Sequence, residues 1–227
     1  MVYLGSYYRT YALDFWGFGE SGSKRETHAI KDFVGLVDQF MELLGISRAP
    51  LVGHSMGGTV SLLTAIEFPH RVSKVVVIGS PVVGSSLFFF PKMFGYKTFG
   101  WLTYHNLWIY KMFYRILAPF YSKDRNWAEM MDRDVSRTTM QAFFASIGSL
   151  RRTDLRPNLS DIQVPVMGMY GHKDIVVSPR QWKPLKEGVR YPYIERFPTA
   201  GHFIMLDEPE LFQQKLKSFL DEERPTD

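Results

Sequence analysis

The apolar positions of this chain follow two different spacings. Between residues 30 and 44 they step by three or four, which predicts a helix with one buried face that ends at Gly45. The apolar residues of that face are Ile30, Phe33, Val34, Val37, Phe40, Met41 and Leu44. The stretch "KVVVIGSPVV" is instead a continuous, β-branched run, which is typical of a strand that is covered on both faces.

Further short apolar runs alternate with helical spacing along the chain. Strands are predicted at residues 11–13, in the buried run "APLVG", at residues 164–170 and at residues 193–197. Helices are predicted in "GGTVSLLTAIEF", which Pro69 ends, in "PRQWKPLKEG" and in "PELFQQKLKSFLDEE". This alternation predicts an α/β fold with a doubly wound, mostly parallel sheet and right-handed crossovers.

Residues 84–157 interrupt the alternation and are too long for a loop in a compact domain. Their apolar residues have helical spacing, as at Trp101, Tyr104, Trp108, Met112 and Leu117. We therefore predict an inserted helical cap between two parts of the core, residues 1–83 and 158–227.

The first half of this cap combines many aromatic residues with lysine and arginine, and residues 85–123 contain no Asp or Glu. One interpretation is a lid whose aromatic face packs on the domain. The other is a lid that makes transient contact with a lipid interface, with its cations toward anionic headgroups. Both interpretations predict a pocket for an apolar substrate.

Composition narrows the class of protein. The 227 residues suit one domain with an insertion, and 45% apolar and 22% charged residues are typical of a globular protein. There is no cysteine, which excludes disulfides and thiolate catalysis. The net charge of +4 is not gathered in basic blocks, so we expect no nucleic-acid partner. Neither a signal peptide nor an apolar membrane span is evident, so we expect a soluble, cytoplasmic protein.

Three polar residues follow predicted strands in the order serine, acid, histidine. They are Ser55 in "LVGHSMGGTV", Asp174 in "YGHKDIVVSP" and His202 in "AGHFIMLDEP". Reactive groups gather at the carboxyl ends of parallel strands, and this order is the one found in α/β-hydrolase triads. The alternatives are that Ser55 is a helix N-cap, and that Asp154 or Asp161 is the acid.

Together with "GHSMGG" and "DFWGFGESG", these motifs resemble the α/β-hydrolase fold family over nearly the whole chain. In this reading Ser55 is the nucleophile, His202 takes its proton and Asp174 orients the imidazole. The backbone N–H of Met56 is an oxyanion donor. The nucleophile elbow also contains His54, which we expect either to pack there or to support the catalytic residues from behind. Its two glycines are Gly53 and Gly57, at which we expect a Cβ atom to crowd the corner. Asp14, Gly17 and Gly19 are expected to shape a loop beside the pocket.

In similar hydrolases, a segment before the "DFWGFGESG" region supplies further strands and a second oxyanion donor. We find no such segment in this sequence. One of its strands would normally lie in the sheet between the strands predicted at residues 11–13 and 49–53. We therefore expect either that these two strands pair directly or that an unpaired edge remains. An unpaired edge favours homo-oligomers or low stability.

The resemblance predicts a serine hydrolase that cleaves carboxylic esters with an apolar acyl or alcohol group through an acyl-enzyme, with no metal or cofactor. Relatives that act as dehalogenases or epoxide hydrolases have an aspartate where Ser55 stands, so those activities are not expected. Carbon–carbon bond hydrolysis and haloperoxidase-like chemistry share the triad and remain open. A catalytically impaired remnant that serves as a binding protein is the further alternative.

Overall fold

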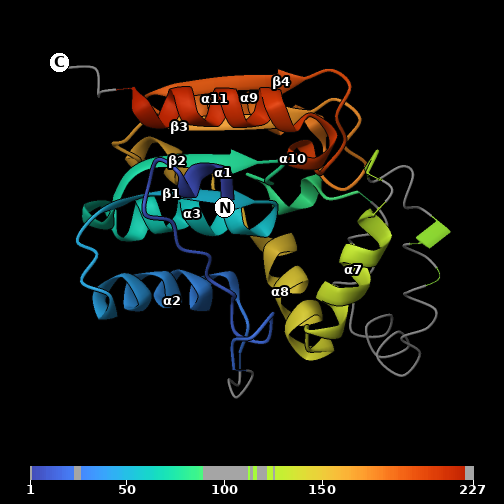
Figure 1. The fold of residues 1–227 in the computed structure, drawn as a ribbon. Helices are drawn as coiled ribbons and strands as arrows, with labels where there is room; N and C mark the ends of the chain where they lie inside the picture. The colour runs from blue at the N-terminus through green and yellow to red at the C-terminus, as the bar shows by residue number, and fades with distance from the viewer. Residues whose placement is uncertain are drawn as a thin grey trace.

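A computed structural model of the chain describes residues 2–22, 27–88, 112, 115–116, 122–124 and 126–222. Its core is a four-stranded parallel sheet in the order β1-β2-β3-β4 (Figure 1). The strands are β1 (Ala49–His54), β2 (Val72–Ile78), β3 (Val166–Gly171) and β4 (Pro192–Phe197). The predicted α/β fold with a mostly parallel sheet is confirmed.

Helices cover both faces of this sheet. On one face lie α3 (Met56–Glu67) and α9 (Trp182–Gly188), with α2 (Ile30–Leu43) packed outside α3. On the other lie α1 (Val2–Gly5), α10 (Ile204–Asp207) and α11 (Pro209–Asp221) (Figure 1). The predicted helices are therefore present, and α2 ends just before Gly45, which adopts a φ of 65°.

The side chains of β2 pack alternately against the helices on one face of the sheet and those on the other. Val75 and Val77 belong to the core cluster that includes Leu62 of α3. Val76 and Ile78 belong to the opposite cluster, which includes Leu216 of α11. Successive side chains of a strand point to opposite faces, so a continuous apolar run suits a strand covered on both sides. The prediction for "KVVVIGSPVV" is confirmed over Val72–Ile78.

The predictions for the edge of the sheet that β1 forms were partly wrong. Strand β1 is not buried, because it pairs only with β2 and Val52 is 43% exposed. Residues 11–13 do not form a strand, and among the described residues no backbone hydrogen bond joins residues 11–14 to 49–53. An extended segment becomes a strand only when a neighbour supplies a ladder of hydrogen bonds, and none is present here. Tyr11 instead packs its ring against Phe40 at 5.8 Å.

The segment predicted as a cap contains two described helices, α7 (Trp127–Ser136) and α8 (Met140–Arg152). Helix α8 is capped by Thr139, which directly precedes it and whose side chain accepts a hydrogen bond from the N–H of Ala142. The predicted helical spacing from Trp101 to Leu117 lies mostly outside the described residues. The boundaries of the cap and its aromatic face therefore stay predictions.

Short 3₁₀ turns complete the connections. They are η1 (Pro69–Arg71), η2 (Gly84–Ser86), η3 (Arg156–Asp161) and η4 (Pro179–Gln181). Across the described part of the chain, every helix is too short or too polar to span a lipid bilayer.

Candidate active site

Ser55 lies on a strained corner between β1 and α3. Its φ of 53° and ψ of −121° make it the one residue other than glycine with a positive φ in the described part of the chain. Its backbone N–H donates to the carbonyl of Ile78 at 2.8 Å, which ties the corner to β2. Such strain at a strand-to-helix turn is the geometry of a nucleophile elbow.

The glycines around Ser55 differ in how much space a Cβ atom would have. A Cβ atom on Gly53 would lie 2.3 Å from the carbonyl carbon of Gly57, so the predicted crowding holds there. At Gly57 the prediction was wrong, since a Cβ atom would meet no atom within 4 Å. The second close contact belongs to Gly58, where a Cβ atom would lie 2.0 Å from Ser80 Oγ. Gly57 sits on the first turn of α3 with its α-carbon toward open space, whereas Gly58 faces β2.

Asp174 and His202 form a buried pair beyond the ends of β3 and β4. His202 Nδ1–H donates to Asp174 Oδ2 at 2.7 Å, and each residue is 4% exposed. Asp174 Oδ1 also accepts from the backbone N–H groups of Val176 at 2.7 Å and Val177 at 2.9 Å. These bonds fix the carboxylate against the imidazole and leave His202 Nε2 as the free ring nitrogen.

The other two acids considered from the sequence have different partners. Asp154 binds the guanidinium of Arg156 at 2.6 Å, and that hydrogen bond lowers the pKa of Asp154. Asp161 accepts from the side chain of Asn158 at 3.2 Å. The structure therefore brings Asp174 to His202, and it places Asp154 and Asp161 in contacts of their own.

His54 connects the serine corner to the Asp174–His202 pair. Its Nε2 atom lies 3.0 Å from the backbone oxygen of His202, and the two imidazole rings are 4.6 Å apart. Burial, followed by the nearby His202, lowers the pKa of His54 to about 3. His54 is thus neutral near pH 7, and its Nε2–H donates to the carbonyl. Of the two roles expected for His54 from the sequence, packing or support of the catalytic residues, this hydrogen bond favours the second.

No hydrogen bond between Ser55 Oγ and His202 Nε2 is recorded among the described residues. In hydrolases without substrate, the contact between nucleophile and base is often long and tightens when substrate binds. The neighbouring His54 ring lies 4.6 Å from the His202 ring, so the corner that carries Ser55 adjoins the His202 loop.

Gly79 is a site residue that the sequence interpretation missed. It follows β2 with a φ of 54°, and a Cβ atom there would lie 3.1 Å from His202 Nδ1 and 3.3 Å from Asp174 Oδ2. A glycine is needed both for the backbone conformation and for the close approach. Its position after the strand in "VVVIGSP" was the available signal.

Asp207 was missed as well, although it lies in the motif that identified His202. Its Oδ2 accepts from the N–H of Gly201 at 2.7 Å, directly before His202. Its Oδ1 accepts from Ser122 Oγ and from the N–H of Lys123, both at 2.8 Å. Asp207 therefore joins the histidine loop to the segment predicted as a cap.

The N-terminus of α3 presents a donor beside Ser55. The carbonyl of Ser55 accepts from the N–H groups of Gly58 at 3.1 Å and Thr59 at 3.4 Å. The N–H of Met56 has no recorded acceptor in the described part of the chain, as is usual for the first residue of a helix. The role of this N–H as an oxyanion donor stays a prediction.

Asp14, Gly17 and Gly19 lie in a loop, as expected, whereas its position beside a substrate pocket stays a prediction. Asp14 Oδ2 accepts from the N–H of Glu20 at 3.0 Å, and Ser21 Oγ donates to the carbonyl of Asp14 at 2.6 Å. Gly17 and Gly19 adopt positive φ values of 83° and 58°.

Within the residues that the structure describes, no group of His, Asp or Glu side chains has the arrangement of a metal site.

Comparison with known proteins agrees with the fold. Residues 3–209 match the model of the alpha/beta hydrolase fold family. Since that range is most of the chain, the chain belongs to this family, and it is a hydrolase.

Individual relatives have several activities. The chain is 26% identical to a 2-hydroxy-6-oxo-6-phenylhexa-2,4-dienoate hydrolase of Burkholderia cepacia over 96% of this chain and 79% of the relative. It is similar in fold to an esterase of Exiguobacterium antarcticum, with a TM-score of 0.78 and 20% identity over 92% of this chain and 80% of that one. A bromoperoxidase of Bacillus anthracis has the same TM-score of 0.78, with 19% identity over the same 92% and 80%.

Proposed function

We propose that this protein hydrolyses carboxylic esters that carry an apolar acyl or alcohol group. The observation that supports this most is the buried Asp174–His202 hydrogen bond of 2.7 Å beside the strained Ser55. A serine hydroxyl is a weak nucleophile at neutral pH and needs an oriented, neutral imidazole to take its proton.

The reaction begins when Ser55 Oγ attacks the ester carbonyl carbon while its proton passes to His202 Nε2. The N–H of Met56 donates to the carbonyl oxygen as that oxygen gains charge. The alcohol then leaves with the proton from His202, and the acyl group stays on Ser55. Water next gives a proton to His202 and attacks the acyl carbon, which releases the carboxylic acid and restores Ser55.

His54 has a positioning role in this scheme. It holds the backbone of His202 through the 3.0 Å hydrogen bond, and its low pKa keeps it neutral when His202 becomes an imidazolium. A charged His54 would repel that imidazolium across a ring separation of only 4.6 Å.

The surroundings of the elbow favour an apolar substrate. The side chains of Met56, Phe15, Trp16 and Phe18 pack against one apolar core cluster, the last three from the loop after residue 14. This apolar surface next to the elbow supports an apolar substrate, because a polar group that contacts it would lose hydration without replacement.

Carbon–carbon bond hydrolysis is the second candidate, favoured by the similarity to the dienoate hydrolase. In this reaction Ser55, again with His202 and Asp174, attacks a ketone carbonyl in place of an ester carbonyl. The two functions are separated by comparing kcat/KM for p-nitrophenyl esters of increasing chain length with kcat/KM for 2-hydroxy-6-oxo-6-phenylhexa-2,4-dienoate.

We expect the ester series to give the higher kcat/KM, rising with acyl length, and Ser55→Ala to remove it. Turnover of the dienoate with no ester turnover would replace our proposal by the second candidate. Absence of both in a folded wild-type protein would favour the non-catalytic alternative.

A further inference from the structure

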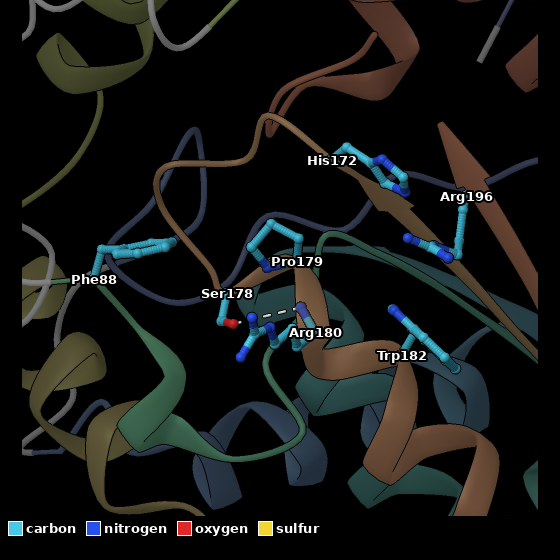
Figure 2. Close-up of a pocket in the computed structure, with 7 residues that line it drawn as sticks. All are labelled: Phe88, His172, Ser178, Pro179, Arg180, Trp182 and Arg196. Carbon is cyan, nitrogen blue, oxygen red and sulfur yellow. Dashed lines mark hydrogen bonds between the residues drawn. The ribbon is translucent and has the colours of Figure 1, made fainter. Parts of the chain in front are cut away.

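A pocket of about 550 Å³ lies beside the connection from β3 to α9, and none of Ser55, Asp174 and His202 lines it. Figure 2 shows His172 and Arg196 on one side of it, from the ends of β3 and β4, and Ser178 and Arg180 on the other. The volume is within the usual range for small-molecule sites. This pocket is separate from the candidate active site, although the same loop carries Asp174.

The residues that line this pocket carry positive charge without a negative charge to balance it. It includes the guanidinium groups of Arg180 and Arg196 and the imidazole of His172, but no carboxylate. In the described part of the chain neither arginine belongs to an ion pair. By contrast, Arg71 binds Asp38 at 2.7 Å and Arg156 binds Asp154 at 2.6 Å.

The acids that neighbour the lining residues in sequence have other partners: Glu195, which directly precedes Arg196, binds Lys215 at 2.9 Å. Phe88 forms one wall of the pocket, and the chain that follows it, residues 89–111, contains no Asp or Glu. The acid nearest in sequence to His172 is Asp174, whose two oxygens are occupied by His202 and by backbone N–H groups. Among the described residues, therefore, no carboxylate pairs with the arginines of this pocket.

Trp182 holds one of these cations in place. The Arg196 guanidinium lies over the indole ring, 5.2 Å from its centroid. Stacking of this kind restricts the side chain while leaving the N–H groups at the edge of the guanidinium free to donate. A preorganised guanidinium loses less entropy when it binds an anion.

We propose that this pocket binds the carboxylate or phosphate group of a small ligand. Arg180 and Arg196 supply paired N–H donors that match the oxygens of either group. His172 and the hydroxyl of Ser178 supply further donors at the same opening. The proposal does not depend on the ester hydrolase activity, since it concerns binding at a different place.

Isothermal titration calorimetry with inorganic phosphate and with benzoate tests this proposal on the full-length protein. The variants are Arg180→Gln, Arg196→Gln and the double change. The matched control is Lys186→Gln, which removes one positive charge from α9 at a residue outside the pocket lining. Thermal melting of each variant checks that it is folded.

We expect at least one probe to bind the wild type, with an affinity about tenfold lower in each arginine variant, because each change removes charge-assisted hydrogen bonds. Lys186→Gln should bind as the wild type does. Binding of phosphate alone or of benzoate alone identifies the source of the anionic group, and binding of both shows that the shared chemistry is sufficient.

Three results would overturn the proposal. The first is that neither probe binds the folded wild type at millimolar concentration. The second is that the arginine variants bind as tightly as the wild type. The third is an equal loss of affinity in Lys186→Gln, which would indicate attraction to the general positive charge.

Discussion

The Asp174–His202 pair and Ser55 lie at the same edge of one sheet, but the sheet supports them differently. The pair follows β3 and β4, is 4% exposed at each residue, and is fixed by hydrogen bonds to Asp174. Ser55 follows β1, whose outer side has no neighbour among the described strands. The proposed acid and base are held by the core, whereas the proposed nucleophile is held by α3, by Ile78 and by the contact of His54 with His202.

The strands themselves show the same contrast. Strands β1 and β2 both have short apolar sequences, yet Val76 of β2 is fully buried and its pairing partner, Val52 of β1, is 43% exposed. Burial is set by what lies beside a strand and not by its own sequence. The following changes test this difference between the two sides of the site, beginning with the largest expected effect.

Asp174→Asn should lower kcat for ester hydrolysis by about 10⁴-fold, because an amide favours the wrong tautomer of His202. Asp154→Asn is the matched control and should change kcat little, since Asp154 binds Arg156. Steady-state kinetics with a p-nitrophenyl ester measure both. A larger loss in Asp154→Asn would show that the acid was misassigned.

Gly58→Ala should lower the free energy of unfolding by about 1–3 kcal/mol, since the added Cβ atom would overlap Ser80 and overpack the turn. Gly57→Ala, one residue earlier, should change it by less than about 1 kcal/mol, because the added atom meets open space and alanine favours a helix. Urea unfolding measures the two variants. Equal effects would contradict the assigned packing of the elbow.

His54→Phe should lower kcat by about tenfold with little change in KM, since it keeps the ring contact but loses a hydrogen bond worth roughly 1 kcal/mol. His54→Gln retains a donor near the position of Nε2 and should recover most of the activity. Comparing kcat and KM of the two variants distinguishes positioning of His202 from general packing. If both variants lose activity equally, the hydrogen bond of His54 is not what matters.

Val52→Lys should have the smallest effect on the free energy of unfolding, about 1 kcal/mol or less, because the side chain is 43% exposed. It should, however, reduce self-association through the edge of β1, since a charge on an edge strand opposes pairing with a second strand. Size-exclusion chromatography of wild type and variant measures this. A wild-type protein that is monomeric at all concentrations would contradict the expected edge pairing.

Much of the fold could be predicted from the sequence, because apolar spacing is a local property. The alternation of strands and helices gave β2, β3, β4, α2, α3 and α11, and strand ends followed by Ser55, Asp174 and His202 indicated where the site lies. The contacts that connect the site could not be predicted this way. The hydrogen bond from His54 to His202 joins residues 148 positions apart. The need for glycine at positions 58 and 79 depends on Ser80 and on the Asp174–His202 pair, which other parts of the chain bring beside them.

The edge of the sheet was mispredicted for a related reason. The sequence of residues 11–13 has strand character, but a strand also needs a partner on which to form its hydrogen bonds. Likewise, "APLVG" is apolar enough for a central strand, and only the arrangement of the sheet places it at an edge. The apolar pattern of a strand therefore does not reveal how many other strands pair with it.

Covalent labelling with a fluorophosphonate, read by intact mass and peptide mapping, tests the role of Ser55 most directly. We expect one label per wild-type chain, located on Ser55, with loss of ester hydrolysis in proportion to labelling. Ser55→Ala should take no label and have no turnover, with a melting temperature within roughly a few degrees of the wild type. Turnover that persists in Ser55→Ala, or a label on another residue, would show that Ser55 is not the nucleophile.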